Sequence, residues 1–492
     1  MLKVTDLLWY KMKYDAIIIG AGLGGLTAGA KLAKEGKTVL LIEQHSKSGG
    51  CATTFKRGDF TLEVGLHEMD GPSPRDMKTR IFNELDVFEN VMFIKVPEFY
   101  HFVNERIDIT IPHDPEEAKK KLQEMFPEDT RGIDAYFNQI LNPKRKPAED
   151  ETSREKSVGE FLDSIISNDD LKLVLLGNLG YFHDDPYSIS LTYYSVAQGS
   201  YYNGGASFIR GGSQVLSDHL AKYITKHGGN VVNNHLVTGI FEENNKLAGV
   251  TYKKKRGTSS EVITAYTDEI IANAAIPNVA ELLPEKYRIK LINEIKTQKP
   301  GASLLTIYFG FKNSLKNLGN QHYSTFVFDS SIKSQSDILK NNKGDFHNRS
   351  FTFIDYSQID SGLAPAGKSV GALCCIDYLS DWENLSAEKY KAKKEDVAQI
   401  FITRLEKLIP GIRDEIEYFE VGTSATIKRY TLNPGGAVYG FAQIPFKPLI
   451  DTSNISDNLH FASAWGKTGG GFSGAIYSGF LCAYYILRKK SS

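Results

Sequence analysis

The stretch that most constrains the fold runs from residue 14 to residue 50 and reads YDAIIIGAGLGGLTAGAKLAKEGKTVLLIEQHSKSGG. Residues 15–19 form a short apolar run with β-branched side chains, which is typical of a buried parallel strand. A glycine-rich turn follows at residues 20–25, and residues 26–35, rich in Ala, Leu and Lys, predict a helix. Residues 38–42 are a second buried apolar run. The stretch therefore predicts a strand, turn, helix and strand in succession.

The glycine-rich turn has the spacing G-x-G-x-x-G and consists of Gly20, Ala21, Gly22, Leu23, Gly24 and Gly25. Gly20 permits a tight turn, Gly22 lets the backbone approach a pyrophosphate, and Gly25 lets the helix pack against the strand. Free N–H groups at the start of the helix would then face the phosphates. A chance glycine turn is the alternative interpretation, but the flanking strands and helix favour a dinucleotide-binding unit.

Glu43 closes the second strand about 20 residues beyond the first glycine, where a carboxylate bonds ribose hydroxyls in dinucleotide-binding folds. A carboxylate at this position disfavours a 2′-phosphate, so we expect no preference for NADP. Gly49 and Gly50 follow shortly after the strand and favour FAD over NAD. The predicted cofactor site also includes Gln44 and Cys51.

Composition excludes several classes of protein. The chain has 492 residues, with 58 basic and 59 acidic residues and a net charge of −1. This balance argues against a nucleic-acid-binding protein, because no excess of positive charge would neutralise phosphates. The four cysteines lack the spacing of disulfides or metal ligands, so we expect a reducing, cytoplasmic location and no metal site. No run of about 20 apolar residues would span a bilayer.

The N-terminal residues 1–13 mix apolar side chains with three lysines and lack the apolar core of a signal peptide. One interpretation is an arm that packs on the body of the protein. The other is an interfacial anchor that lies on a membrane surface. Both interpretations stay open at this point.

The middle of the chain predicts an inserted region. Asp114 and Pro115 begin a helix that runs to about residue 126. Residues 141–159 are polar and charged, which predicts an exposed loop with a solvated face. Residues 181–202 contain seven aromatic side chains, which pack either in a core or on the wall of a cavity: Tyr181, Phe182, Tyr187, Tyr193, Tyr194, Tyr201 and Tyr202.

The chain then returns to the nucleotide-binding region. Ser213 predicts the cap of a helix at residues 214–227, and a pair of strands follows at 230–233 and 237–241. Later apolar runs predict further strands at residues 247–253, 261–266, 269–274, 304–311 and 370–377, and a helix at 386–408.

Several motifs together resemble the family of carotenoid desaturases, carotenoid isomerases and retinol saturases. Residues 48–55 (SGGCATTF) resemble its second glycine motif, and residues 210–212 (RGG) precede a helix as they do there. Residues 428–440 (KRYTLNPGGAVYG) resemble a segment shared by carotenoid isomerases and retinol saturases. This segment is more specific for the family than the first glycine turn, which many flavoproteins have. Residues 458–465 (NLHFASAW) and 469–475 (GGGFSGA) resemble the closing strand, glycine loop and helix, although an acid usual in relatives is absent.

The resemblance implies an α/β fold with an FAD-binding, Rossmann-like domain of the GR2 type and an interleaved α+β substrate domain. On this basis residues 1–13 are an N-terminal arm. The FAD-binding domain takes residues 14–70, 200–284 and 436–492. The substrate-binding domain takes residues 71–199 and 285–435.

The resemblance also assigns residues to the cofactor. Val237 would lie beside the adenine, although an ordinary strand valine is the alternative. A helix dipole would favour negative charge near the flavin, at a helix start formed by Gly471, Phe472, Ser473 and Gly474.

Three residues are candidate proton donors or acceptors, in the order His67, Tyr430 and Glu68. His67 follows a strand predicted at residues 60–64 and would touch the flavin or the substrate, or serve as a structural histidine. Glu63 stands where the family usually has Asp.

The family chemistry is hydride movement between flavin and a carbon of a long hydrophobic polyene, such as a carotenoid, retinoid or unsaturated lipid. Desaturation, saturation and isomerisation share the motifs, so the direction and the electron donor or acceptor stay open. Membrane-resident substrates would suit attachment to a membrane surface. Two alternatives are a flavin amine oxidase, using Lys428 and Tyr430, and a non-enzymatic prenyl-lipid carrier on the same fold, against which the intact glycine motifs argue.

Overall fold

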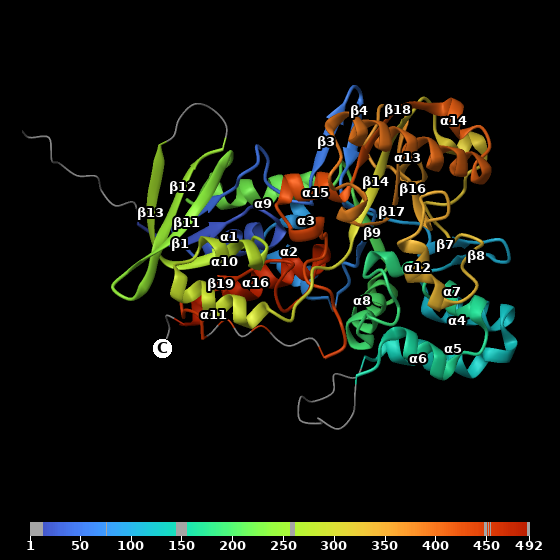
Figure 1. Cartoon of the computed structure of the whole chain (residues 1–492), viewed down its shortest axis with the longest axis horizontal. Coiled ribbons are helices and arrows are strands. Elements are labelled where there is room, and N and C mark those ends of the chain that lie inside the picture. The colour runs from blue at the N-terminus through green and yellow to red at the C-terminus, as the bar shows by residue number, and fades with distance from the viewer. Residues whose placement is uncertain are drawn as a thin grey trace, which may run out of the picture.

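The structure is a computed structural model that describes residues 13–74, 76–143, 155–255, 261–446, 450, 452 and 454–489. Almost all of the predicted N-terminal arm and the central part of the predicted loop at 141–159 lie outside the described residues. Two seven-stranded sheets form the two ends of the molecule, one at the left and one at the upper right of Figure 1. Among the described residues, no helix combines the length and the apolar sequence needed to cross a bilayer.

The first sheet is mostly parallel and is built from three separate parts of the chain. Its strands pair in the order β10 (Asn230–Val232), β2 (Val39–Ile42), β1 (Lys13–Ile19), β13 (Val262–Ala272), β12 (Lys246–Lys254) and β11 (His235–Glu243), and β19 (Leu459–Phe461) also pairs with β13. Strands β10, β2, β1, β13 and β19 are parallel, whereas β12 and β11 return antiparallel. Burial on both faces explains the continuous apolar runs of β1 and β2.

Two predictions about these strands are wrong. The strands predicted at 230–233 and 237–241 do not pair with each other, because β10 pairs with β2 and β11 pairs with β12. Asn234, between them, has a φ of 60°, in the left-handed region that turns the chain sharply. The two runs predicted at 261–266 and 269–274 form one strand, β13, whose first half pairs with β12 and whose second half pairs with β19.

Helices cover both faces of the first sheet. On one face, Ile18 and Leu41 share a core with α1 (Leu23–Lys34), α9 (Gln214–Lys226) and α16 (Gly471–Lys489). On the other face, Ile17 and Leu40 share a core with α10 (Ile276–Leu282) and α11 (Glu285–Ile295). Helix-covered parallel strands confirm the predicted α/β fold class.

Helix α1 begins at Leu23, three residues before the helix predicted at 26–35, because the glycines of the turn enter the helix itself. Gly24 lies inside α1 at a point where α16 crosses closely. A Cβ on Gly479 of α16 would be 2.1 Å from the carbonyl oxygen of Gly24. Glycines on both helices therefore let the first and last helices of this region pack backbone to backbone.

The second sheet pairs its strands in the order β18 (Ile416–Gly422), β14 (Ser303–Phe311), β17 (Ser369–Asp377), β16 (Phe351–Asp355), β15 (Ser324–Val327), β7 (Tyr100–Val103) and β8 (Asp108–Ile111). All neighbours are antiparallel except β15 and β7. Helix α13 (Ala387–Leu408) packs Phe401 and Leu405 into a core with Phe309 and Leu373. The predicted strands at 304–311 and 370–377 and the helix at 386–408 are confirmed.

Short elements complete the chain. Two small sheets come from these elements: β3 (Thr54–Arg57) pairs with β4 (Phe60–Glu63), and β9 (Ala206–Ile209) lies between β5 (Met69–Asp70) and β6 (Phe93–Lys95). The remaining α-helices are α2 (Met77–Glu84), α3 (Val87–Asn90), α4 (Pro115–Met125), α5 (Thr130–Leu141), α6 (Val158–Ile165), α7 (Asp169–Leu175), α8 (Leu191–Gly204), α12 (Ile338–Asn342), α14 (Ile412–Glu415) and α15 (Ser424–Thr431). Helices α4 to α7 lie below the second sheet in Figure 1.

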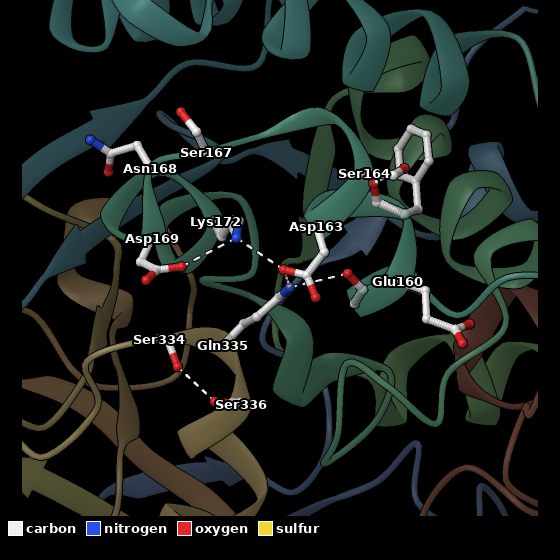
Figure 2. A network of polar contacts seen from close by, with 12 residues as sticks. Glu160, Asp163, Ser164, Ser167, Asn168, Asp169, Lys172, Ser334, Gln335 and Ser336 are labelled. Carbon is white, nitrogen blue, oxygen red and sulfur yellow. Dashed lines mark hydrogen bonds and ion pairs between the residues drawn. The ribbon is translucent and has the colours of Figure 1, made fainter.

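A network of polar contacts connects helices α6 and α7 to the segment just before α12 (Figure 2). Asp163 of α6 accepts hydrogen bonds from Lys172 Nζ at 2.9 Å and from Gln335 Nε2 at 2.7 Å. Gln335 also donates to the carbonyl of Gly159 at 3.0 Å and is 1% exposed. Because Gln335 precedes α12, the network fixes α6 and α7 against a segment far away in the sequence.

Candidate active site

A large cavity of about 1860 Å³ lies where the first sheet, the second sheet and α8 meet. Pockets that hold one small molecule measure about 300–1,000 Å³. The cavity is therefore large enough for a dinucleotide together with a second ligand. Leu304, Thr306 and Tyr308 of β14 line it from the second sheet, and Val237 of β11 lines it from the first.

The glycine-rich turn forms one end of this cavity. The predicted cofactor residues that line this end are Gly20, Gly22, Leu23, Glu43, Gln44, Gly49, Gly50, Cys51 and Val237. Gly22 is the extended residue before α1, and a Cβ there would lie 2.8 Å from Asn273 Nδ2. The backbone is thus bare at the start of a helix, where N–H groups and the helix dipole favour a phosphate.

Three residues of the predicted site do not line the cavity. The N–H of Ala21 is buried and donates to Glu43 Oε2 at 2.7 Å. A Cβ on Gly24 would be 1.8 Å from the carbonyl oxygen of Ala462, and one on Gly25 would be 2.2 Å from that of Gly20. Ala21, Gly24 and Gly25 therefore shape the turn and do not face a ligand.

Glu43 lines the cavity while its carboxylate is held in place by the backbone. Oε2 accepts from Ala21 N, and Oε1 accepts from His45 N at 2.8 Å. Burial raises the pKa of Glu43, and these two backbone hydrogen bonds oppose the rise. The fixed carboxylate suits a hydrogen bond to ribose hydroxyls, as expected from its position after β2.

The start of α16 forms another wall, lined by Gly471, Phe472, Ser473 and Gly474. Ser473 Oγ donates to Asp70 Oδ1 at 2.5 Å. Asp70 in turn pairs with Lys78 Nζ at 2.7 Å, and the same Nζ lies 2.6 Å from Asp76 Oδ2. Lys78 is fully buried. No sequence motif indicates this cluster, because Ser473 is far in the chain from Asp70, Asp76 and Lys78 and only the fold brings it to them.

Glu63 fixes the segment that carries the candidate proton donors. Its carboxylate accepts from the N–H groups of Gly65 at 3.1 Å and Leu66 at 2.9 Å, and from Ser213 N and Oγ, each at 2.7 Å. The Ser213 hydroxyl therefore donates to Glu63 and does not cap α9 through its side chain, which corrects the sequence prediction. Glu63 thus anchors the segment ahead of His67 to the start of α9.

His67 and Glu68 both line the cavity. His67 Nδ1 lies 3.9 Å from Cys374 Sγ, and its ring centroid is 5.7 Å from that of Tyr181. Burial lowers the pKa of His67 to about 4, so the imidazole is neutral at pH 7. Burial also raises the pKa of Glu68 well above its ordinary value, and the charge of nearby Glu98 raises it further. This environment favours the neutral imidazole of His67 and the protonated, proton-donating form of the Glu68 carboxyl.

Tyr430 lies apart from these two residues. Its ring centroid is 5.4 Å from that of His45, and Gln44 Nε2 donates to its carbonyl oxygen at 3.4 Å. Both neighbours follow Glu43 directly, so Tyr430 sits at the nucleotide end of the cavity, and it is 48% exposed. The structure therefore does not bring Tyr430 together with His67 and Glu68. Tyr430 is a candidate because of the motif that contains it, and this motif does not define the distance from Tyr430 to His67 or Glu68.

The aromatic side chains of residues 181–202 pack both in the core and on the wall of the cavity. Tyr194 and Tyr202 are core residues, and Tyr187 is exposed. The others line the cavity: Tyr181, Phe182, Tyr193 and Tyr201. The cavity wall next to α8 is therefore aromatic.

Protein stability should depend on the charge of His67. Its pKa in the folded state, about 4, is below the ordinary value of 6.5. The unfolded chain therefore binds more protons between these values, and stability is lost as pH falls from 6.5 towards 4. The expected contribution is at most about 3 kcal/mol.

Chemical unfolding of wild-type protein and the His67→Gln variant at pH 7.5 and pH 4.5 measures this contribution. We expect the wild type to lose more free energy of unfolding than the variant. His113 and His322 also have lowered pKa values, so the comparison between the two proteins isolates His67. An equal loss in both proteins would show that His67 is not buried as described.

Comparisons with known proteins agree with this site. The model of the family described as flavin containing amine oxidoreductase matches residues 23–487. All-trans-retinol 13,14-reductase of Danio rerio is 25% identical, over 96% of this chain and 86% of that protein. Chloroplastic prolycopene isomerase of Arabidopsis thaliana is 26% identical, over 97% of this chain and 84% of that protein. These relatives confirm the resemblance seen in the motifs.

Solved structures agree in fold. An oxidoreductase from Methanosarcina mazei superposes with a TM-score of 0.68 at 17% identity, covering 97% of this chain and all of that one (100%). A wild-type putrescine oxidase bound to putrescine gives a TM-score of 0.64 at 16% identity, covering 97% of this chain and 99% of that one. The glycine-lined end of the cavity, the fixed Glu43 carboxylate and the start of α16 fit the predicted cofactor, FAD. The chain belongs to the flavin-containing amine oxidoreductase family and is an FAD-dependent oxidoreductase.

Proposed function

We propose that this protein transfers hydride between FAD and a carbon–carbon unit of a long hydrophobic polyene, such as a carotenoid, a retinoid or a related unsaturated lipid. The observation that carries the proposal is the cavity of about 1860 Å³, which continues from the glycine-rich turn to the aromatic wall at Tyr181 and Tyr201. Relatives named for all-trans-retinol and prolycopene along nearly the whole chain support it. Saturation, desaturation and isomerisation are the three forms that the reaction could take.

When bound, FAD supplies the centre that accepts or donates hydride. The residues of this chain would hold the polyene against it and keep water away. Tyr308 and Tyr439 suit this role, because both are cavity-lining phenols whose pKa burial raises above the ordinary value. We assign proton transfer to His67 and Glu68. We do not assign it to Tyr430, which lies at the nucleotide end of the cavity.

An amine oxidase is the second candidate, and the geometry favours it less. The sequence offered Lys428 and Tyr430 for such a site. Lys428 is exposed and is not among the residues that line the cavity, and Tyr430 lies beside Gln44 and His45. The likeness to putrescine oxidase concerns the fold alone. A non-enzymatic lipid carrier disagrees with the intact cofactor end of the cavity.

Incubation of the oxidised and the reduced flavoprotein with a panel of carotenoids, retinoids and unsaturated lipids tests the proposal. A product that has gained two hydrogens by mass spectrometry indicates saturation, and one that has lost two indicates desaturation. An unchanged mass with altered retention indicates isomerisation. We expect one of these for at least one polyene. Bleaching of the flavin by putrescine or benzylamine, with every polyene unchanged, would overturn the proposal in favour of amine oxidation.

Attachment to a membrane surface and a cytoplasmic location stay predictions. Met77, Val196 and Phe446 support the first, because they are exposed apolar side chains that also line the cavity. Co-sedimentation with phosphatidylcholine vesicles would test this attachment, and protein that stays in the supernatant would count against it.

A further inference from the structure

Two buried polar groups beside the cavity have no hydrogen-bond partner among the described residues. They are the Oε2 atom of Glu68 and the hydroxyl of Tyr181. Glu68 is only 7% exposed, and both residues line the cavity. An unpaired polar group of this kind has lost its hydrogen bonds to water without gaining any in the protein, which destabilises the fold. Such groups are rare in folded proteins and call for an explanation.

The two groups are neighbours. The charge of Glu68 is among the causes that raise the pKa of Tyr181, after burial itself. His67, next to Glu68 in the chain, packs its ring 5.7 Å from that of Tyr181. A carboxyl and a phenol therefore face the same part of the cavity.

The surrounding polar groups are already engaged and leave these two unpaired. The Tyr323 hydroxyl donates to the carbonyl of His67, and the Tyr356 hydroxyl donates to the carbonyl of Leu66 at 3.0 Å. Glu98 Oε1 accepts from Tyr323 N at 2.6 Å. The first two bonds fix the backbone just ahead of Glu68, and the third fixes the backbone of Tyr323. The site is therefore held rigidly while its two central polar atoms lack partners within the chain.

We propose that Glu68 and Tyr181 form an oxygen-recognition site that binds a hydroxyl or carbonyl oxygen carried by an otherwise hydrocarbon substrate. The inference rests on the proposed function and narrows it to an oxygenated polyene, an alcohol or aldehyde, in place of a pure hydrocarbon. The carboxyl donates to the substrate oxygen, and the phenol donates to or accepts from it. A ligand without this oxygen would leave both groups unpaired, and sites built in this way discriminate strongly against such a ligand.

Binding of a matched pair of ligands to the purified flavoprotein tests this inference. The pair is all-trans-retinol and the hydrocarbon with the same skeleton and a methyl group in place of the hydroxymethyl. The change in the flavin absorbance spectrum reports the dissociation constant of each. We expect wild-type protein to bind the alcohol at least about tenfold more tightly than the hydrocarbon.

Variants test whether the two residues cause the preference for the alcohol over the hydrocarbon. Glu68→Leu and Tyr181→Phe should each reduce this preference to less than about threefold. Glu68→Gln should retain part of the preference, because an amide still forms hydrogen bonds. Tyr187→Phe is the matched control, since the Tyr187 hydroxyl donates to Asp163 at 2.8 Å outside the cavity. It should keep the wild-type preference. Tyr181→Phe provides the test if Glu68→Leu fails to fold.

Other outcomes would overturn the inference. Equal affinity of the wild type for the two ligands would do so. An unchanged preference in both variants, with turnover lost on both ligands, would leave Glu68 a role in proton transfer alone and none in recognition of the substrate oxygen. Conversion of the hydrocarbon as readily as the alcohol would leave the proposed function standing without this site. If neither ligand perturbs the flavin and no polyene is converted, the proposed function itself fails.

Discussion

Replacement of Gly22 by valine is expected to weaken FAD binding at least about tenfold. A Cβ at this position would lie 2.8 Å from Asn273 Nδ2, and the added methyl groups would extend into the cavity beside the start of α1. Overpacking of this kind costs about 1–3 kcal/mol. The backbone approach to the pyrophosphate would also be lost. A tenfold loss of affinity corresponds to about 1.4 kcal/mol, and we expect at least that loss.

The ratio of flavin absorbance to protein absorbance after purification, followed by titration with FAD, measures this effect. Gly180→Ala is the matched control, because a Cβ there would meet no atom within 4 Å and the residue needs no positive φ. It should bind FAD like the wild type. A folded Gly22→Val protein with full flavin content would contradict the assignment of the pyrophosphate to this turn.

Replacement of Lys78 by methionine is expected to destabilise the protein severely. Lys78 is fully buried, and its ammonium lies 2.7 Å from Asp70 and 2.6 Å from Asp76. Its removal leaves two carboxylates with little exposure and no cation between them. Breaking a buried pair in this way costs about 3–5 kcal/mol. Because Asp70 also accepts from Ser473 at the start of α16, flavin affinity should fall as well.

Urea unfolding gives the free energy of this change, and a triple variant identifies its cause. Addition of Asp70→Asn and Asp76→Asn to Lys78→Met should recover part of the lost stability, because the uncompensated charges disappear. Lys119→Met is the control, since Lys119 pairs with Glu116 on the surface of α4. Its unfolding midpoint should match that of the wild type. A Lys78→Met protein as stable as this control would show that the buried cluster is not formed.

Features that depend on contiguous residues could be predicted from the sequence. The cofactor unit is one of them, since β1, the glycine turn, α1 and β2 follow one another within residues 13–42. Their apolar runs and glycine spacing reflect local backbone geometry and burial. The helix starts at Asp114 and Ser386 are likewise local, because each side chain caps its own helix.

Features that depend on distant residues could not be predicted in this way. Tyr430 and His67 stood together as candidate acids, yet one lies beside His45 and the other beside Tyr181. The neighbours of β10 were misassigned for a related reason. Strand pairing in a parallel sheet joins segments that are separated by long crossovers, and adjacency in the sequence says little about it.

The strand–turn–helix unit that binds the dinucleotide can be recognised without the structure, because consecutive residues form it. The set of polar groups that meet in the cavity depends instead on long-range packing. Ser473 meets Asp70 across 403 positions of the chain, and Tyr356 meets Leu66 across 290. Such long-range contacts form only when the two sheets and α8 pack around the cavity. The same packing leaves the buried carboxyl of Glu68 unpaired.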